Sequence, residues 1–386
     1  MDKTIDFESL GIKSKLLDEK KEQTTYKTKY VKEYVENWLC VVSKEKKFLK
    51  INFIDCMCNA GVYKDGDPCT SILVIELFCK FAKSNPAKLF NVYLNDIDKE
   101  RVDASKNVIR FLFPKIDNII NLKIYFEEQD VNCYLTNQSY NNSFKSSAAT
   151  VLYVDPYDFG TVKINNITNF LKYNYSELLF NVFTMDFVRN ANDERIKKCI
   201  DCSKIIDKAD LMDEIAKMLK VPKIKYSFSY QFKNQNNTEL YQIFYSTPNI
   251  RGLEKLKEAI WKVFKGKRFH RNKRVGENEQ ICLFTEEDDE KYFLRIYSEE
   301  AKDLLMNTFK KNTVTYNQIE TLILEKTMLR KGHIIENVIK PLIMCGKIIK
   351  LGKVQIKSNY TKDYYEIVGD ENEDISEKKY AIQNRS

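Results

Sequence analysis

Short apolar runs recur along the first half of the chain and are separated mostly by segments with helical spacing. The runs at 51–56, 89–94, 122–126, 150–154 and 177–183 each have the length of a buried strand. Most of the intervening segments place apolar residues three or four positions apart, as an amphipathic helix does. Strands that alternate with helices build a parallel sheet with both faces covered. The pattern predicts an α/β protein with a doubly wound, mostly parallel, Rossmann-type sheet.

The second half of the chain departs from this alternation. Residues 224–232 and 239–246 alternate apolar with polar positions and predict an antiparallel hairpin at the edge of the sheet. Residues 190–222 are charged and helical, and we interpret them as an insertion, whereas the polar residues 136–147 predict a loop. Three predicted helices and a two-stranded ribbon fill 293–368, an order typical of a winged helix.

Composition limits the class of protein. A chain of 386 residues with 43% hydrophobic residues can bury one large core or two smaller ones. It has no apolar stretch of eighteen residues and no secretory signal, so we expect no membrane association. Ten cysteines without regular spacing favour a reducing cytoplasm. With only His270 and His333, we expect neither a metal site nor a Ser-His-Asp triad.

The end of the first predicted strand is typical of a cofactor site. Asp55 ends the strand, and the tight turn that follows contains Cys58, Asn59 and Gly61. In doubly wound sheets a nucleotide-type cofactor docks on this turn. Asn59 stands where a glycine is expected, but asparagine tolerates a positive φ better than other residues with a side chain. The turn is therefore predicted to approach a ligand with its backbone.

Two further acids follow the next strands in order. Asp96 ends the second strand and is predicted to accept the ribose hydroxyls of the cofactor, and Asp130 follows the third strand near the expected adenine amine. Each acid alone would more often be an ordinary turn residue, but three in succession favour a cofactor pocket. No phosphate-cradling GxxxxGK loop is present, which argues against a nucleoside triphosphate. The predicted cofactor is S-adenosylmethionine (SAM).

Asp155, Pro156 and Tyr157 end the fourth strand, at the edge where such sheets carry their chemistry. Methylation of an exocyclic amine needs an acceptor for the N–H bonds and a flat surface for the base. Asp155 is predicted to orient the amine, Pro156 to fix the turn and Tyr157 to stack on the base. The alternative is that these residues only terminate a strand. Arg189, beyond the fifth strand, either holds a substrate phosphate or carboxylate or pairs with Asp186.

A dense basic run follows the last predicted helix of the sheet domain, at residues 265–274. Cationic clusters with interleaved aromatic residues attract phosphate backbones, and a solvated basic face is the alternative. We favour phosphate contact for this run. The residues expected to make it are Lys267, Arg268, Arg271, Lys273 and Arg274.

The same motifs resemble the three-Cys-motif partner (TcmP) family over most of the chain, from about Lys27 to Ile367. Asn59, Cys69 and Ser71 depart from the family pattern. The resemblance implies a class I methyltransferase-like fold, a cofactor contact at Tyr63, and a radical-SAM-like partner protein with three cysteines. The matching residues include Ile54, Asp55, Gly61, Tyr63, Asp65, Gly66, Thr70, Asp155, Pro156, Tyr157, Glu177, Leu178, Leu179, Asn181, Asp186, Arg189, Ala259, Trp261, Arg330, Gly332, His333, Gly346 and Lys347.

These observations predict a cytoplasmic SAM-dependent methyltransferase that acts on a base amine of nucleic acid, RNA rather than DNA. The alternative is a catalytically weak nucleic-acid-binding adaptor for the radical-SAM-like partner, and a nuclease is disfavoured because no acidic metal motif stands out. The methylated atom and the oligomeric state stay open. The predicted segments are a flexible arm (1–25), a methyltransferase-like domain (26–265), a basic linker (266–292), a winged helix (293–368) and a disordered tail (369–386).

Overall fold

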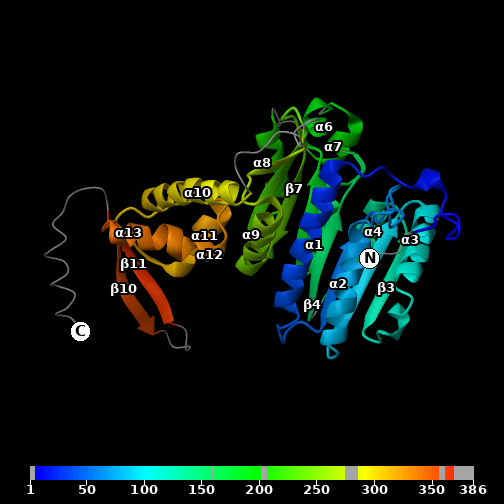
Figure 1. Cartoon of the computed structure of the whole chain (residues 1–386), viewed down its shortest axis with the longest axis horizontal. Helices are drawn as coiled ribbons and strands as arrows, with labels where there is room; N and C mark the ends of the chain where they lie inside the picture. Colours follow the sequence, from blue (N-terminus) through cyan, green and yellow to red (C-terminus); the bar gives the residue numbers. More distant parts are fainter. Residues whose placement is uncertain are drawn as a thin grey trace. The chain divides into compact units, whose positions relative to one another are not determined.

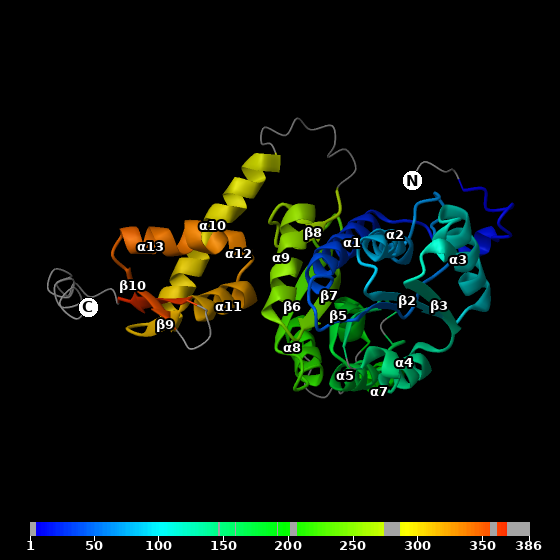
Figure 2. The ribbon, with the colours of Figure 1, turned by 90° about the horizontal axis from the view of Figure 1, so that it is seen from below.

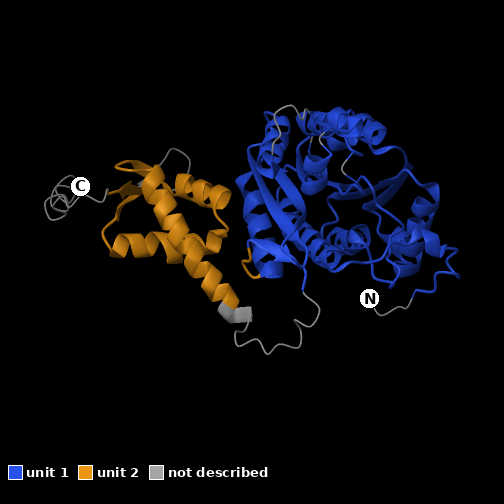
Figure 3. Cartoon of the chain, turned by 90° about the horizontal axis from the view of Figure 1, so that it is seen from above, with its two compact units in different colours: residues 1–264, 268–281 blue, residues 265–267, 282–386 orange. Residues whose placement is uncertain are grey.

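The computed structural model describes residues 5–145, 147–158, 160–190, 192–200, 207–273, 286–355 and 361–368. The chain forms two compact units, shown in different colours in Figure 3. The larger unit comprises residues 1–264 and 268–281, and the smaller unit comprises residues 265–267 and 282–386. Among the described residues, no helix is long and apolar enough to cross a membrane.

An eight-stranded sheet is the framework of the larger unit, with the strand order β3-β2-β1-β4-β5-β7-β6-β8. The five strands from β3 to β5 are parallel, and β7 runs antiparallel between β5 and β6. This is the strand order of the class I methyltransferase-like fold, so the predicted fold class is confirmed for this unit. The strands are β1 Lys50–Asp55, β2 Leu89–Asp96, β3 Leu122–Glu128, β4 Ala148–Val154, β5 Ser176–Val182, β6 Tyr226–Lys233, β7 Glu239–Thr247 and β8 Phe269–Arg271.

Helices cover both faces of this sheet. Figures 1 and 2 show α9, α1 and α2 on one face and α4, α5 and α8 on the other. Strands β4 and β5 are buried along their whole length, which explains why they are continuous apolar runs in the sequence. The helices are α1 Glu22–Val42, α2 Thr70–Ser84, α3 Lys99–Leu112, α4 Val131–Ser139, α5 Ile164–Tyr173, α6 Thr184–Arg189, α7 Glu194–Cys199, α8 Lys208–Met218 and α9 Ile250–Phe264.

Two segments differ from the sequence expectation in secondary structure. The first part of the predicted loop at 136–147 belongs to α4, because Tyr134 and Leu135 are buried and Asp130 caps the helix at Asn132 and Cys133. The predicted basic linker begins as strand β8, which pairs parallel with β6. Local polarity suggested loops in both places, but contacts with the sheet and its helices override it.

The segment before α1 also differs from the expected arm. Helix α1 begins at Glu22 rather than Tyr26, and Ile12, Leu16 and Leu17 are buried in the described part of the predicted 1–25 arm. Apolar side chains that pack in this way hold the segment against the larger unit. The described residues before α1 therefore form part of the folded unit.

The smaller unit contains a helical cluster and a three-stranded sheet of order β10-β11-β9. The helix predicted over 331–345 is present from Lys331 to Met344 and is interrupted by a π-helical turn at Ile335–Ile339, just before Pro341. The predicted ribbon is present and gains β9 as a third strand, while the winged-helix assignment stays a prediction. The predicted tail 369–386 lies outside the described residues. The elements are α10 Glu286–Thr308, β9 Thr313–Thr315, α11 Tyr316–Lys326, α12 Lys331–Ile334, α13 Lys340–Met344, β10 Ile348–Gln355 and β11 Thr361–Ile367.

Candidate active site

A cavity of about 410 Å³ opens in the larger unit where β1, β4 and β5 end. Carboxyl ends of adjacent parallel strands are where doubly wound sheets bind ligands. The cavity brings the turn after β1 together with the turn after β4, which are a hundred residues apart in sequence. Its wall includes the predicted site residues Asp55, Cys58, Asn59, Tyr63, Asp155, Pro156 and Tyr157.

Asp155 is the most heavily bonded carboxylate in the cavity wall. Its Oδ2 accepts hydrogen bonds from Lys27 Nζ at 2.6 Å and from the Tyr153 hydroxyl at 2.8 Å, and its Oδ1 accepts one from Asn181 Nδ2 at 2.8 Å. Lys27 comes from the first turns of α1, and its side chain is 11% exposed. This ion pair is therefore shielded from much of the solvent, and it fixes the orientation of the carboxylate.

Asn181 gives the cavity a buried acceptor that has no partner. The residue is 2% exposed and lines the cavity, and its Oδ1 makes no hydrogen bond while its Nδ2 holds Asp155. A buried polar atom without a partner costs about 1–3 kcal/mol, so such atoms mark places where a ligand or water can bind. A ligand N–H or O–H group placed between Asp155 and Asn181 would give the Asn181 Oδ1 atom its missing hydrogen bond.

Asp55 lies at the floor of the cavity and is 2% exposed. It accepts hydrogen bonds from the Ser71 hydroxyl and from the backbone N–H of Met57. Burial outweighs these bonds and raises the pKa of Asp55 to about 7. The carboxyl group therefore changes charge near neutral pH, and its ionised form would attract a cationic ligand.

The turn after β1 has the backbone geometry that was predicted. Asn59 has φ 57° and Gly61 has φ 88°. A Cβ atom on Gly61 would also lie 3.3 Å from Ser105 Cα, closer than such atoms normally approach. Gly61 itself does not line the cavity, so its role is to let the turn pack against α3.

Asp96 differs from its predicted role. The residue is 3% exposed and is not part of the cavity wall. Its Oδ2 accepts the backbone N–H of Asn59 at 3.1 Å and its Oδ1 accepts that of Asp98 at 3.0 Å. Burial raises the pKa of this carboxyl group. In this structure Asp96 therefore holds the backbone of the turn through hydrogen bonds instead of presenting its oxygens to a ribose.

A polar network covers the outer side of the turn. Asn59 donates through Nδ2 to Asp18 Oδ2 at 2.5 Å and accepts through Oδ1 from Arg101 at 3.1 Å. Arg101 also pairs with Asp18 Oδ1 at 3.5 Å and donates to the Tyr157 hydroxyl, and its guanidinium lies 4.9 Å from the Tyr157 ring centroid. The network connects the segment before α1, the first turn of α3 and the Pro156–Tyr157 turn.

The remaining predicted site residues lie away from the cavity. Asp130 Oδ1 caps α4 by accepting the N–H groups of Asn132 and Cys133, which is the structural alternative to an adenine contact. Arg189 is exposed in the last turn of α6, and the ion pairs of the described chain do not join it to Asp186. Neither residue is part of the cavity wall.

The predicted phosphate-binding residues have other contacts where they are described. Lys267 pairs with Asp289 at 3.3 Å, and Arg271 donates to the Gln235 carbonyl at 3.4 Å. The backbone N–H of Lys273 donates to the Glu22 carboxylate, and Arg268 is exposed. Arg274 lies outside the described residues. The four described cations, Lys267, Arg268, Arg271 and Lys273, do not line the cavity.

Several contributors to the site were not predicted from the sequence, among them Lys27, Asp18 and Arg101. A signal for Lys27 exists, since it precedes Tyr30, Val31 and Tyr34 at helical spacing and so falls on the buried face of α1. A charged residue on such a face needs a partner. Asp18 and Arg101 carry no comparable signal, because only the packing of distant segments brings them to Asn59.

The residues present fit one end of SAM directly. SAM carries a sulfonium and an ammonium group, and the cavity wall holds the carboxylates of Asp18, Glu19, Asp55 and Asp155 against the ammonium groups of Lys21 and Lys27. Aromatic rings of Tyr63, Tyr153, Tyr157, Tyr241 and Phe183 also line it, and aromatic faces attract cations. At the ribose end, the Asn59 amide is already bonded by Asp18 and Arg101, and both oxygens of Asp96 already accept backbone N–H groups.

Comparisons with known proteins give distant likenesses only. No family model and no curated protein matches the chain, so the resemblance to the TcmP family stays a prediction. The methyltransferase domain of bacterial CtHen1 shares 10% identity over 56% of this chain and 99% of its own, with a TM-score of 0.30. A Legionella pneumophila protein shares 11% identity over 62% and 92%, with a TM-score of 0.37.

A third similar structure is a Listeria monocytogenes protein described as a class I SAM-dependent methyltransferase. It shares 9% identity over 56% of this chain and 59% of its own, with a TM-score of 0.31. The strand order of the larger unit establishes its fold independently of these likenesses.

Proposed function

We propose that the chain is a SAM-dependent methyltransferase that methylates an exocyclic base amine of nucleic acid, with RNA as the substrate. One observation carries the proposal: the Asp155 carboxylate and the unpartnered Asn181 Oδ1 line the same cavity as the turn after β1. An amine nitrogen with two N–H bonds would use both acceptors. A methyl donor bound on the turn after β1 would then face the lone pair of the amine nitrogen.

The chemistry follows from these groups. Bound SAM supplies a methyl group on a positively charged sulfur. Asp155 and Asn181 accept the two amine N–H bonds and direct the nitrogen lone pair towards the methyl carbon, which contributes by orientation. Asp155 or solvent would take up the proton that the amine nitrogen loses when it gains the methyl group. Lys27 acts as a positioning residue, because it holds the carboxylate of Asp155 in place.

The aromatic lining supports a planar substrate. Tyr157 has a relative exposure of 54% at the cavity mouth, and Phe183 and Tyr241 line the cavity. A base held between such rings must be unpaired or flipped from its helix, because the amine is otherwise engaged in pairing. Single-stranded or looped RNA meets this requirement at the lowest cost. This favours RNA over duplex DNA as the substrate.

We also propose that the smaller unit is a winged helix that binds nucleic acid, and that a radical-SAM-like three-Cys-motif protein is a partner. The supporting feature for the first proposal is the element order, in which α11 and α12 precede the β10–β11 ribbon. The second rests on the family resemblance. Both can fail without affecting the chemistry proposed for the cavity.

The test is transfer of a labelled methyl group. The full chain is incubated with SAM labelled on its methyl group and with transfer RNA, single-stranded RNA or duplex DNA of equal nucleotide concentration. Label in RNA that Asp155→Asn abolishes supports the proposal, and mass analysis of the nucleosides identifies the methylated atom. Label retained by the Asp155→Asn variant, or no transfer to any substrate although SAM binds, would contradict it.

A second candidate function is a nucleic-acid-binding adaptor. Two contacts favour it: Arg101 and Asp18 cover the turn, and Lys27 already occupies one oxygen of Asp155. A calorimetric titration with SAM separates the two functions. Heat of binding in the wild-type chain supports the enzyme, whereas no heat in either the wild type or Arg101→Ala supports the adaptor.

A further inference from the structure

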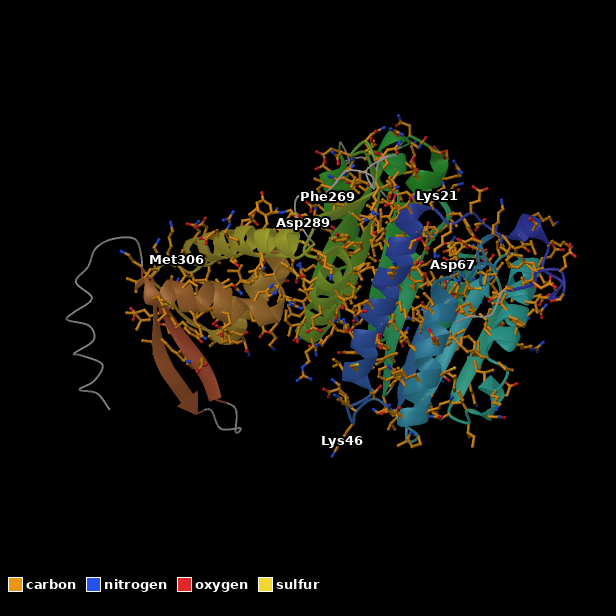
Figure 4. All side chains as sticks on the ribbon, in the orientation of Figure 1. Lys21, Lys46, Asp67, Phe269, Asp289 and Met306 are labelled. Carbon is orange, nitrogen blue, oxygen red and sulfur yellow. The ribbon has the colours of Figure 1, made fainter. Side chains whose placement is uncertain are left out.

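The end of the larger unit opposite the cavity is a second candidate for nucleic-acid contact. Lys21 lies just before α1 and Lys46 just after it, and Figure 4 shows them at opposite ends of this unit. A helix of 21 residues separates the two ends by roughly 30 Å. The parallel strands begin at the Lys46 end, so this surface lies far from the candidate active site.

Five segments form this surface, which we call the amino-end face: residues 43–50, 85–89, 145 with 147–148, 172–176 and 223–225. Backbone pairing holds the first four together, since Lys50 pairs with Leu89 and with Ala148, and Thr150 pairs with Ser176. The fifth joins them through Lys223 Nζ, which donates to the Tyr173 carbonyl at 2.9 Å. Segments that are far apart in sequence therefore form one continuous surface.

The charge of the amino-end face is strongly positive. Its five segments contain one acid, Glu45, and that carboxylate pairs with Arg251 at 2.8 Å. Within the described chain, none of the lysines on this face forms an ion pair with a carboxylate. Lys88 Nζ is already bonded to the carbonyls of Val42, Glu45 and Phe48, so it holds the face together instead of offering a phosphate contact. The other lysines of the face are Lys44, Lys46, Lys47, Lys50, Lys145, Lys172, Lys223 and Lys225.

Several lysines on other faces of the same unit do form ion pairs. Lys99 pairs with Asp103 at 2.7 Å, Lys262 with Glu33 at 2.7 Å, and Lys80 with Glu36 at 3.3 Å. The amino-end face instead crowds like charges, and both burial and the nearby Lys145 lower the pKa of Lys223. Such crowding is relieved when an anion binds.

Aromatic rings lie among these lysines. Tyr140 and Tyr173 have relative exposures of 59% and 39%, and their ring centroids are 5.2 Å apart. Lys172 Nζ lies 5.8 Å from the Tyr173 ring centroid. Lys47 Nζ lies 5.6 Å from the ring centroid of Tyr175. Exposed aromatic rings are stacking surfaces for unpaired bases, and the adjacent ammonium groups suit the phosphates between them.

We propose that the amino-end face binds single-stranded nucleic acid, with its lysines on the phosphates and with Tyr140 and Tyr173 stacked on bases. Charge alone would equally suit a duplex, but a paired base cannot stack on a side chain without opening the helix. The face goes beyond the proposed methyl transfer, because it would anchor a strand about 30 Å from the chemistry. It can therefore be tested without a methyl donor.

The experiment measures binding of the full chain to a fluorescent 20-nucleotide single-stranded RNA by anisotropy across a salt series. The variant Lys47→Ala/Lys145→Ala/Lys172→Ala is expected to bind at least about tenfold more weakly at low salt. The slope of the logarithm of its binding constant against the logarithm of the salt concentration should be shallower by about 2, since each phosphate contact to a single strand contributes about 0.7. The variant Tyr140→Ala/Tyr173→Ala should bind the RNA with an affinity lower by roughly tenfold or more, and the salt dependence of its binding should be unchanged.

The matched control is Lys80→Ala/Lys99→Ala/Lys106→Ala, which removes three lysines that form ion pairs on other faces. It should bind the RNA within twofold of the wild type. Equal losses in both triple variants, or wild-type affinity in the amino-end variants, would overturn the proposal. If the Tyr140→Ala/Tyr173→Ala variant lost affinity for duplex RNA by the same factor, the proposal that the face prefers single strands would be overturned. Binding to phosphatidylserine vesicles without RNA binding would assign the face to a lipid surface instead.

Discussion

The ammonium group of Lys27 lies 2.6 Å from Oδ2 of Asp155 and joins the start of α1 to the turn that follows β4. The side chains of these two residues are 11% and 20% exposed, so solvent screens the pair only in part. Helix α1 therefore contributes to the candidate active site as well as to the packing of the sheet. The first two predictions test this relationship.

Asp155→Asn should lower the rate of methyl transfer by about 100-fold or more, because it removes the charge that accepts the amine N–H and its proton. The dissociation constant of SAM should stay within about threefold. Single-turnover transfer and calorimetry measure the two quantities. Asp158→Asn is the control, since among the described residues Asp158 bonds within its own turn and pairs with the exposed Arg195. Equal rates in the two variants would contradict the assignment.

Lys27→Met should destabilise the chain by about 1–3 kcal/mol, because it leaves a partly buried carboxylate without its cation. In the double variant with Asp155→Asn much of this loss should disappear, giving a coupling energy of roughly 0.5–3 kcal/mol. Urea unfolding of the wild type, the two single variants and the double variant measures it. The exposed pair Lys99–Asp103 is the comparison, with an expected coupling near 0.3–0.5 kcal/mol. Additive effects at Lys27 and Asp155 would show that the ion pair is not formed in solution.

Stability should fall as the pH rises from about 4 to 7. Burial raises the pKa of Asp55 from 3.8 to about 7, so the folded state holds a proton that the unfolded chain has released. The stabilisation is complete below pH 4 and is lost as the pH passes 7, by an amount on the order of a few kcal/mol. Burial also raises the pKa of Glu177 from 4.5 to about 7, which changes the stability in the same direction.

The check is a set of urea unfolding curves between pH 4 and pH 8. Asp55→Asn should flatten the decline, because the amide stays neutral at every pH in this range. Glu177→Gln should flatten a separate share of it. The same slope in the wild type and both variants would mean that neither carboxyl group is protonated in the fold near neutral pH.

Removing the network over the β1 turn should strengthen SAM binding. Arg101→Ala shifts the population towards an uncovered turn while keeping the Asp18 carboxylate in the cavity wall, and the apparent dissociation constant falls in proportion to the competent fraction. We expect a decrease of about three- to tenfold, measured by calorimetry. Lys13→Ala is the control, because Lys13 lies in the same segment before α1 and pairs with Glu100 at the surface. Weaker binding in Arg101→Ala would instead make Arg101 a ligand contact.

Gly252→Ala should destabilise the larger unit by about 1–3 kcal/mol through overpacking. A Cβ atom there would lie 2.4 Å from Thr247 Oγ1 and 2.5 Å from the Tyr245 hydroxyl, too close without movement of the buried Glu177 cluster. Gly332→Ala is the control in the smaller unit, where a Cβ atom meets nothing within 4 Å. Calorimetric unfolding should show a lower transition for the first variant and an unchanged or higher one for the second.

Much of the framework follows from local pattern. The apolar runs at β1, β2, β4 and β5 indicated buried parallel strands, and a hairpin pattern indicated β6 and β7, because side-chain periodicity follows backbone geometry. The same pattern located the turn with Asn59 and the Asp155–Tyr157 segment. Strands of one parallel sheet end at the same edge, which is why residues a hundred positions apart could be assigned to one site.

Long-range packing decided the rest. Helix α4 and strand β8 formed in polar segments because contacts with the sheet and its helices outweigh local preference. Asp96 fixes the Asn59 backbone, and Asp18 and Arg101 reach the same turn from segments with no local signal. The amino acid order thus determined which strands exist and where their polar ends lie. Which side chains meet at those ends was decided only by the folded chain. The contacts join residues far apart in the sequence, and no regular spacing between them could have predicted the contacts.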